Sequence, residues 1–436
     1  MYFFIGIKGA GMSALAQIMK QMGYVVAGSD LKNHFFTQIG LEEKNIPFYE
    51  YNKENIKEDM TIIVGASIKD DHEEYIRAKE LGLTIYSYAE MVGVLTKKYK
   101  TITIAGCHGK TTTTSMMSLV LNKILGCNYL IGDGTGDAND INKYFVLEAC
   151  EYQRHFLYYE KDYAIITNID LDHVDYFKNI EDVVDAYQSY VSTAKKYVIA
   201  CGEDLYTNQL TSSVPIKFYG FQDDMDIIAK NIKYYNKGTS FDCFIENELY
   251  ANFDLPIFGS HMVLDALAVI AVCYYEGING NLVNEVFQTY TGAKRRFSQE
   301  IIGDNVVIDD YAHHPNEVKS ILNAVKQKFS DKKIIGIIQP HTFSRTQEFA
   351  LDFAKILNNI DKTYVLDIHK AREKQENYPN ITSYTIINEL SNGYHLNMDE
   401  GHKIIESVPT AYVIMSPNDL SDLKNDIINN LKQIKN

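Results

Sequence analysis

A glycine-rich loop between a predicted strand and a predicted helix constrains this chain more than any other stretch. The apolar, β-branched run 101–105 predicts a buried strand, and residues 115–125 predict a helix. The loop between them ends in Gly109-Lys110-Thr111. Backbone N–H groups of such a loop and of the helix N-terminus can hold phosphate oxygens, and the aligned peptide dipoles favour negative charge. We therefore expect ATP here, with Lys110 near the β- and γ-phosphates and the Thr111 hydroxyl reaching Mg²⁺.

This loop is shorter than the standard phosphate loop. Only two residues separate Gly106 from Gly109, whereas the full Gly-x4-Gly-Lys-Ser/Thr pattern is longer. An ordinary glycine-rich turn is the alternative, but the strand–helix context of Gly-Lys-Thr favours phosphate binding. The residues expected at the nucleotide are Gly106, Cys107, His108, Gly109, Lys110, Thr111 and Thr112.

Length and charge narrow the class of protein. A chain of 436 residues has room for several domains of roughly 100–200 residues each. Its net charge of −15 argues against nucleic acid as a partner. Six scattered cysteines without a Cys-x-x-Cys pair predict reduced thiols in a cytoplasmic protein. The N-terminus predicts a strand rather than a signal peptide, and no run of about 18 apolar residues predicts a membrane span.

The first predicted domain, residues 1–97, begins with a strand, a glycine turn, a helix and a second strand over 24–28 that leads to an acid. This order is typical of a dinucleotide-type fold. The Gly-x-x-Gly-x-Gly spacing differs from the NAD fingerprint, so we expect a diphosphate at the turn and a ribose hydroxyl at Asp30, with a purely structural turn as the alternative. The expected substrate contacts are Gly9, Gly11, Met12, Ser13, Asp30 and Ser67.

The second predicted domain, residues 98–292, contains the phosphate loop. Apolar strands at 144–148 and 163–169 end in Glu148 and in a segment that includes His173. Acids and imidazoles at strand ends beside a phosphate loop indicate magnesium coordination and γ-phosphate chemistry. A solvated strand end and a structural histidine are the alternatives. The expected metal ligands are Thr111, Glu148 and His173, and residues 228–254 predict a β-meander.

The third predicted domain, residues 293–436, alternates strands and helices as a second doubly wound unit. Its strands lead into polar loops along one edge of the sheet. The Arg295-Arg296 pair at its start suits phosphate or carboxylate recognition, with an exposed basic pair as the alternative. The loop candidates are His313, His314, His341 and Arg345, and the two adjacent histidines could instead cap a helix.

These motifs, in this order, resemble the Mur ligase family over essentially the whole chain. The segments that carry the resemblance are Gly6–Ser13, Gly106–Thr114, Glu148–Glu151, Thr167–Asp175, Arg295–Phe297, Asp309–Pro315 and Gln339–Thr346. The last two are similar to the branch that adds L-alanine, and the run 148–157 is similar to its members in low-GC Gram-positive bacteria. The resemblance implies an α/β protein of three consecutive domains: Rossmann-like, central P-loop ATPase-type, and Rossmann-like.

The resemblance also implies a reaction, namely ATP-driven amide formation in peptidoglycan precursor synthesis. The carboxylate of UDP-N-acetylmuramate would attack the γ-phosphate of ATP, and the amine of L-alanine would attack the resulting acyl phosphate. A monomer or weak homodimer is expected. The implied catalytic residues are Lys110, Glu148, His173, His314 and Arg345, with Arg296 at the nucleotide and Arg295, His313 and His341 at the substrates.

The chain departs from the family pattern at two places. His261–Asp265 stands where His-Asn-x-x-Asn is usual, and Met415–Asp419 stands where Gly-Ala-Gly-Asp is usual. Two alternatives therefore stay open: a recycling ligase that attaches a ready-made peptide, and a non-catalytic nucleotide-binding homologue. An NAD-dependent dehydrogenase is rejected because it leaves Lys110 unexplained.

Overall fold

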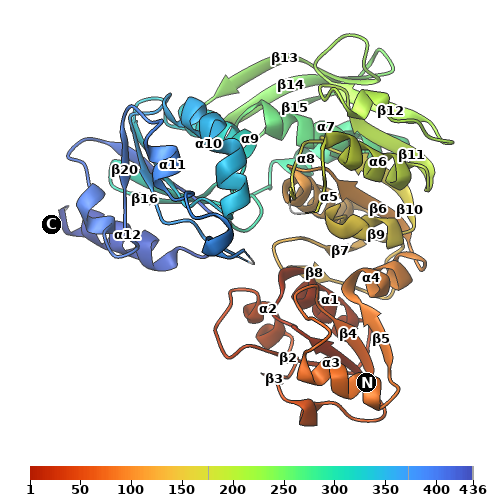
Figure 1. The fold of residues 1–436 in the computed structure, drawn as a ribbon. Coiled ribbons are helices and arrows are strands. Elements are labelled where there is room, and N and C mark those ends of the chain that lie inside the picture. Colours follow the sequence, from red (N-terminus) through yellow and green to blue (C-terminus); the bar gives the residue numbers. More distant parts are fainter. Residues whose placement is uncertain (175, 372, 435–436) are drawn as a thin grey trace. The chain divides into compact units, whose positions relative to one another are not determined.

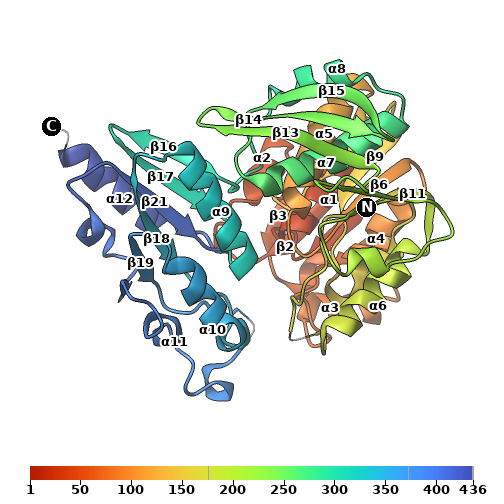
Figure 2. The same cartoon turned by 90° about the horizontal axis from the view of Figure 1, so that it is seen from above.

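The computed structural model describes residues 1–174, 176–371 and 373–434, and this described chain divides into two compact units. The first comprises Met1–Ile232, Phe241–Leu255 and Val263–Thr291; the second comprises Lys233–Ser240, Pro256–Met262 and the chain from Gly292 onward. The elements are labelled in Figures 1 and 2. The α/β class with three sheet-based domains is confirmed, while the boundaries near 97 and 292 stay predictions. Asp175, within one of the family-like segments, lies outside the described residues.

The N-terminal sheet is parallel, with strand order β3-β2-β1-β4-β5. Its strands are β1 Tyr2–Ile5, β2 Val26–Asp30, β3 Phe48–Glu50, β4 Thr61–Val64 and β5 Thr84–Ser87, and its helices are α1 Ala10–Gln21, α2 Gln38–Glu43, α3 Glu73–Glu80 and α4 Tyr88–Thr96. Successive side chains of a strand point to opposite faces. Phe4 therefore packs with α1 and α4, whereas Phe3 packs with Ala78 of α3. The predicted strand over 24–28 is displaced by two residues, which puts Asp30 inside β2.

The central sheet has the strand order β15-β14-β13-β12-β11-β10-β6-β9-β7-β8. Its strands are β6 Lys100–Ala105, β7 Cys127–Leu130, β8 Gly136–Asp137, β9 Tyr144–Glu148, β10 Lys161–Ile166, β11 Ala194–Cys201, β12 Ile216–Gly220, β13 Ile227–Tyr235, β14 Gly238–Ile245 and β15 Glu248–Leu255, with helices α5 Lys110–Ile124, α6 Ile180–Val191, α7 Ser260–Tyr275 and α8 Gly280–Phe287. The predicted meander is present as β13–β15, and it extends this sheet.

Strand register decides where the site of this domain lies. In the parallel core, Ile104 of β6 is paired with Glu148 of β9, and Ala105 is paired with Ile166 of β10. The carboxyl ends of these strands therefore meet at one edge of the sheet. Ligands bind at that edge in open α/β sheets, so the chain folds its phosphate loop and its strand-end acids into one place.

The C-terminal sheet has the order β16-β17-β21-β18-β19-β20, and β16 runs antiparallel to β17. Its elements are β16 Ser298–Ile302, β17 Asn305–Asp310, β18 Lys333–Ile338, β19 Lys362–Val365, β20 Gly393–His395, β21 Thr410–Met415, α9 Pro315–Lys328, α10 Phe343–Leu357, α11 Tyr384–Ile387 and α12 Ser421–Ile434. Ile308 packs with α9 and α10 on one face, and Val307 packs with α12 on the other. This is the doubly covered sheet that the sequence predicts.

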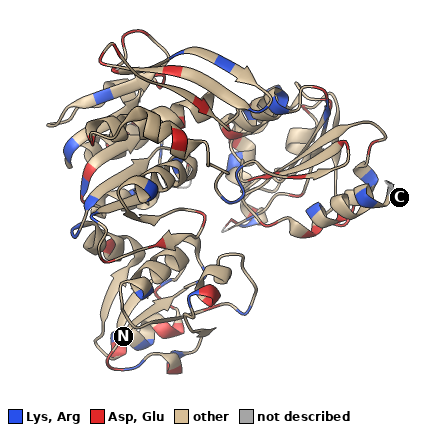
Figure 3. Ribbon diagram, turned by 180° about the vertical axis from the view of Figure 1, so that it is seen from behind, with Lys and Arg blue, Asp and Glu red and all other residues tan. Residues whose placement is uncertain are grey.

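The distribution of charge is mixed along the elements. Figure 3 shows basic and acidic residues on the same helices, as in α12. None of the helices within the described ranges combines the length and apolar composition that a membrane crossing needs.

Candidate active site

The phosphate loop connects β6 to α5 through two glycines with left-handed backbone. Gly106 has φ +139° and Gly109 has φ +82°, and a Cβ at Gly106 would lie 1.9 Å from Thr167 Oγ1. Glycine is needed here because other residues rarely adopt this φ and because no side chain fits. Asn168, at the end of β10, accepts from the His108 amide through Oδ1 (2.9 Å) and donates through Nδ2 to the His108 carbonyl (2.9 Å).

Two loop residues predicted at the nucleotide have other partners. The Cys107 amide donates to the Asn168 carbonyl (3.2 Å), and the Cys107 thiol donates to the Asp170 carbonyl (3.0 Å). The His108 amide is also used by Asn168, and its ring Nε2 lies 3.2 Å from Asp170 Oδ2. These contacts shape the loop, and the predicted contacts of Cys107 and His108 with the nucleotide stay predictions.

Lys110 lies at the first turn of α5 and points back across the loop. Its ammonium donates to the carbonyls of Gly106 and Cys107, and it lies 3.1 Å from Glu151 Oε2. Burial alone would lower the pKa of this ammonium, but the surrounding acidic groups, with Glu151 the strongest, together outweigh burial and the pKa is raised. Burial likewise opposes ionisation of Glu151, yet the charge of Lys110 and a hydrogen bond from His173 lower its pKa. The pair is therefore charged at neutral pH.

Glu148 lies at the end of β9, beside the first turn of α5. Its Oε2 accepts from the Thr111 hydroxyl (2.9 Å) and from the Gly132 amide (3.0 Å). The structure thus brings together Thr111 and Glu148, the residues predicted to share one metal ion. Sequence reasoning missed Gly132, whose amide orients the carboxylate.

A second group of donors lies beside this pair. One ligand atom each from Glu151, Asp172 and His173 lies within 4.8 Å of the others, and His173 Nε2 is 3.5 Å from Glu151 Oε1. His173 has φ +51°, and its ring is 4.9 Å from that of Tyr152. Two carboxylates and an imidazole fit a divalent cation. His173 was predicted from sequence, whereas Glu151 and Asp172 were not assigned.

The glycine turn of the N-terminal domain is held by Asp30. The Asp30 carboxylate accepts from the amides of Lys8 and Leu31, each at 2.7 Å, and the side chain is buried. Met12 and Ser13, predicted as substrate contacts, are buried in the packing of α1. Asp30 fixes the turn with both oxygens, and Met12 and Ser13 support the helix from inside, while the predicted substrate contacts of all three stay predictions.

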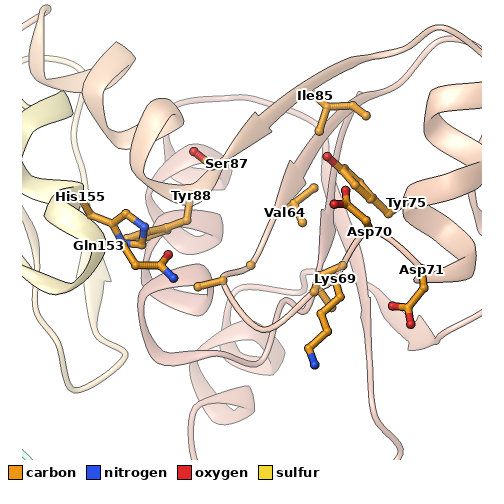
Figure 4. Close-up of a pocket in the computed structure, with 13 residues that line it drawn as sticks. Val64, Lys69, Asp70, Asp71, Tyr75, Ile85, Ser87, Tyr88, Gln153 and His155 are labelled. Carbon is orange, nitrogen blue, oxygen red and sulfur yellow. The ribbon is translucent and has the colours of Figure 1, made fainter. Parts of the chain in front are cut away.

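A pocket of about 620 Å³ opens at the carboxyl end of β4. Figure 4 shows Lys69, Asp70, Asp71 and Tyr75 at one side and Tyr88, Gln153 and His155 at the other. The pocket includes Ala66, the neighbour of the predicted Ser67, and Ser67 itself is exposed. Gln153 and His155 come from the central domain, and burial lowers the pKa of His155. Sequence reasoning missed both of these residues.

In the C-terminal domain, the structure groups the predicted histidines and Arg345. The rings of His313 and His341 are 5.7 Å apart, His341 stacks on His369 at 5.6 Å, and Arg345 Nη1 donates to His341 Nδ1 (3.1 Å). His314 is the N-cap of α9 and accepts from the Asn316 amide (3.4 Å). The capping alternative is therefore present for His314, and its catalytic role stays a prediction.

The two adjacent arginines have different surroundings. Arg295 donates to both Asp309 oxygens and to the carbonyls of Ser416, Pro417 and Asn418. Through these bonds Arg295 holds the altered 415–419 loop, and its predicted contact with the substrate stays a prediction.

Arg296 lies 4.9 Å over the ring of Tyr311 and 3.8 Å from Glu317 Oε1. These contacts leave its predicted role at the nucleotide untested.

The other departure from the family pattern lies against the phosphate loop. Asp265 Oδ1 accepts from the Thr113 hydroxyl (3.0 Å), and a Cβ at Gly109 would lie 2.7 Å from the same oxygen. The Asp265 side chain is buried. The acid that replaces an amide therefore packs on the backbone that would hold the nucleotide.

Models of known protein families match three successive stretches of the chain. They are described as "Mur ligase family, catalytic domain" over residues 2–100, "Mur ligase middle domain" over 104–273 and "Mur ligase, glutamate ligase domain" over 295–420. Together these matches leave only short segments of the chain uncovered.

Solved structures share the fold over the whole chain. The UDP-N-acetylmuramate–alanine ligase of Thermotoga maritima is 24% identical with a TM-score of 0.84, over 100% of this chain and 99% of that one. A murein peptide ligase of Psychrobacter arcticus is 22% identical with a TM-score of 0.73, over 99% and 98%. The MurF ligase of Thermotoga maritima in complex with ADP is 15% identical with a TM-score of 0.65, over 94% and 95%.

At these identities the solved structures establish the fold, whereas the three family models in their order establish membership. The phosphate loop with Lys110, Thr111 and Glu148 lies within the matched middle domain. The chain belongs to the Mur ligase family of ATP-dependent, peptide-bond-forming ligases.

Proposed function

We propose that this protein ligates L-alanine to the carboxylate of UDP-N-acetylmuramate, with hydrolysis of ATP, in peptidoglycan precursor synthesis. The observation that carries the proposal is the convergence of Lys110, Thr111, Glu148, Glu151 and His173 at one sheet edge. A carboxylate is a poor acylating agent, and phosphorylation gives it a leaving group. The first step brings two anions together, so it needs fixed positive charge between them.

The chain supplies that charge through Lys110. Its ammonium is anchored by loop carbonyls and Glu151, so little reorientation is needed when phosphate oxygens arrive. A preorganised cation in a largely buried site stabilises developing negative charge more than a solvated one does. The γ-phosphoryl group then passes to the substrate carboxylate, and attack by the amine breaks the acyl–phosphate bond and releases phosphate.

The residues fit magnesium at two positions. Thr111 and Glu148 would hold the ion that accompanies ATP, and Glu151, Asp172 and His173 would hold a second. Magnesium, when bound, supplies positive charge between the phosphates and the carboxylate. Carboxylate oxygens and a hydroxyl suit this hard cation.

The pocket at the end of β4 is our candidate site for the nucleotide sugar. It has the size of a small-molecule site, and it lies at the strand ends of a Rossmann-like sheet. Tyr88 lines it and lies directly against the glycine turn, because a Cβ at Gly11 would be 2.7 Å from Tyr88 Cζ. We place the diphosphate near this turn and the sugar on the side of Gln153 and His155.

Recognition of the amine is assigned to the C-terminal domain. The group formed by His313, His341, His369 and Arg345 offers cationic and imidazole donors to an amino-acid carboxylate. L-Alanine is favoured by the sequences around His313 and His341 and by the fold similarity to the Thermotoga enzyme. The fold is also similar to that of a murein peptide ligase, so a ready-made peptide is the second candidate amine.

Phosphate release tests the proposal. The protein is given ATP, Mg²⁺ and UDP-N-acetylmuramate, with L-alanine, L-glutamate or a cell-wall tripeptide added separately. We expect the wild type to release phosphate when L-alanine is added, and we expect Lys110→Ala to release none. Release with the tripeptide alone would move the assignment to peptide recycling, and no release with any amine would identify a non-catalytic homologue.

A further inference from the structure

Residues 131–138, which comprise the loop after β7 and strand β8, form the 131–138 loop. This loop contacts both the phosphate-loop region and helix α1, whose relative position matters for the proposed reaction. At one end, the Gly132 amide donates to Glu148 Oε2 (3.0 Å), the carboxylate assigned to the nucleotide-bound metal. At the other end, residues 134–138 contact α1, whose first turn follows the glycine turn of the N-terminal domain. The geometry of this loop therefore sets the position of Glu148 relative to that turn.

One face of α1 carries the contacts to the loop. Ser13, Gln17 and Gln21 are spaced by four residues, so their side chains lie one above another. Gln17 Nε2 donates to the Gly134 carbonyl (2.9 Å) and to Ser13 Oγ (3.1 Å). Gln21 donates to Asp137 and accepts from the Ala138 amide (3.2 Å).

The amide of Gln17 is the buried centre of this network. Its side chain is 3% exposed, and both hydrogens of Nε2 are used, one on each side of the contact. Ser13 Oγ continues the network by donating to the Thr37 carbonyl (2.8 Å). A buried amide that loses its partners has a desolvation cost, so this arrangement specifies one position of the loop against the helix.

The contact is too close for side chains on the loop. A Cβ at Gly136 would lie 2.2 Å from the Ala14 carbonyl oxygen, and a Cβ at Gly134, which has φ +84°, would lie 2.9 Å from Thr37 Cγ2. Gly136 therefore packs on the backbone of α1, and Gly134 packs on the Thr37 side chain. Because these contacts are close, a shift of the loop would also move Gly132 and Glu148.

We propose that Gln17 is a positioning residue for the ligation. By fixing the 131–138 loop against α1, it holds the diphosphate turn in register with Glu148 and the phosphate loop. This inference rests on the proposed function for the roles of the turn and of Glu148. A misplacement of about 1 Å between reacting groups can cost on the order of 10²-fold in rate. Loss of the Gln17 bonds should therefore lower kcat and weaken the response to Mg²⁺ more than it weakens ATP binding.

The test compares isosteric variants. Gln17→Met keeps the length of the side chain without its donors, and Gln17→Glu brings a carboxylate to the Gly134 carbonyl. The matched control is Gln38→Met, because Gln38 is also a buried glutamine but donates to Glu42 within α2 (2.8 Å). We expect both Gln17 variants to lose about 10-fold or more in kcat and to need several-fold more Mg²⁺ for half-saturation. Gln38→Met should lower Tm by a similar amount but should change neither kcat nor the Mg²⁺ concentration for half-saturation.

A binding experiment without amine completes the test. Affinity for Mg²⁺ and a non-hydrolysable ATP analogue is measured with and without UDP-N-acetylmuramate. We expect the sugar to tighten nucleotide binding in the wild type and to lose this effect in Gln17→Met. The inference about Gln17 would be overturned if the sugar tightened nucleotide binding equally in the wild type and in Gln17→Met. It would also be overturned if kcat fell in proportion to Tm in the Gln17 and Gln38 variants alike. Either result would leave the proposed function intact. A wild type that does not bind the sugar would overturn the proposed function and this inference together.

Discussion

Lys110 and Glu151 form a buried ion pair at the phosphate loop. The Lys110 ammonium lies 3.1 Å from Glu151 Oε2, and the Glu151 side chain is 1% exposed. The second oxygen of the same carboxylate lies 3.5 Å from His173 Nε2. One carboxylate therefore orients both the lysine of the loop and the histidine of the candidate metal group.

Removing the lysine should abolish activity and destabilise the fold. Lys110→Met leaves Glu151 buried without its main partner, which costs about 3–5 kcal/mol in free energy of unfolding for a pair of this kind. We expect phosphate release to fall by at least about 10²-fold. The double variant Lys110→Met/Glu151→Gln should regain stability in urea unfolding but no activity. A double variant no more stable than the single one would contradict the account of the pair.

The pair should also shape stability at acid pH. Because the pKa of Glu151 is lowered in the folded protein, its contribution is present above the unfolded pKa of about 4.3 and is lost as pH falls through the folded value. Below about pH 4, the free energy of unfolding of Glu151→Gln should therefore decrease less steeply with falling pH than that of the wild type. Glu43→Gln, an exposed carboxylate of α2, is the control and should follow the wild type. Identical acid profiles for Glu151→Gln and the wild type would contradict this.

A buried lysine away from the loop makes stability depend on pH in a different range, from neutral to alkaline values. Lys161 is fully buried, donates to Thr193 Oγ1 (2.8 Å) and lies 4.3 Å over the Tyr190 ring. Burial lowers its pKa to about 7. Between that value and about 10.4 the unfolded chain binds more protons, so this lysine makes stability rise with pH.

Lys161→Met removes this dependence. Its advantage in unfolding free energy over the wild type should be largest near neutral pH and should shrink by up to about 1.4 kcal/mol per pH unit toward pH 9. Lys195→Met, at a lysine 55% exposed, is the control and should show a constant difference. A constant difference for Lys161→Met as well would contradict the lowered pKa.

Asp265 should weaken nucleotide binding through its charge. Its carboxylate packs on the phosphate loop at Gly109 and Thr113, where phosphates would meet a like charge. Asp265→Asn keeps an acceptor for Thr113 and removes the charge, so KM for ATP should fall several-fold at little change in kcat. An effective interaction of about 1 kcal/mol corresponds to roughly 5-fold. Added salt should reduce the difference in KM for ATP between Asp265→Asn and the wild type, because it screens the charge. A higher KM in Asp265→Asn than in the wild type would contradict this prediction, because it would show that the charge assists binding.

The phosphate loop and its strand-end acids could be predicted from sequence because local signals fix them. Apolar β-branched runs identify β6 and β9, and parallel pairing then brings Lys110 and Glu148 to one edge. The same reasoning identified the family, because its segments follow the same order along all three domains.

The remainder of the site depends on geometry that no local pattern reports. Glu151 follows β9 in an irregular segment where Gln153 and Arg154 have φ of +51° and +57°, so periodicity does not show where its side chain lies. A second carboxylate three residues after Glu148 was the available signal. The hydrogen bond from the Lys8 amide to Asp30 could not be predicted either, because a pattern of side chains does not show where the amides of a turn point. Gln17 likewise meets a carbonyl 117 residues away.

The central claim is tested most directly by oxygen transfer. UDP-N-acetylmuramate labelled with ¹⁸O in both carboxylate oxygens is incubated with the protein, ATP, Mg²⁺ and L-alanine. The ¹⁸O content of the released phosphate and of the ligated product is then measured by mass spectrometry. An acyl-phosphate route predicts one labelled oxygen in the released phosphate and the other in the new amide carbonyl. Ligated product with unlabelled phosphate would contradict the acyl phosphate, and labelled phosphate formed only with a peptide amine would contradict L-alanine as the substrate.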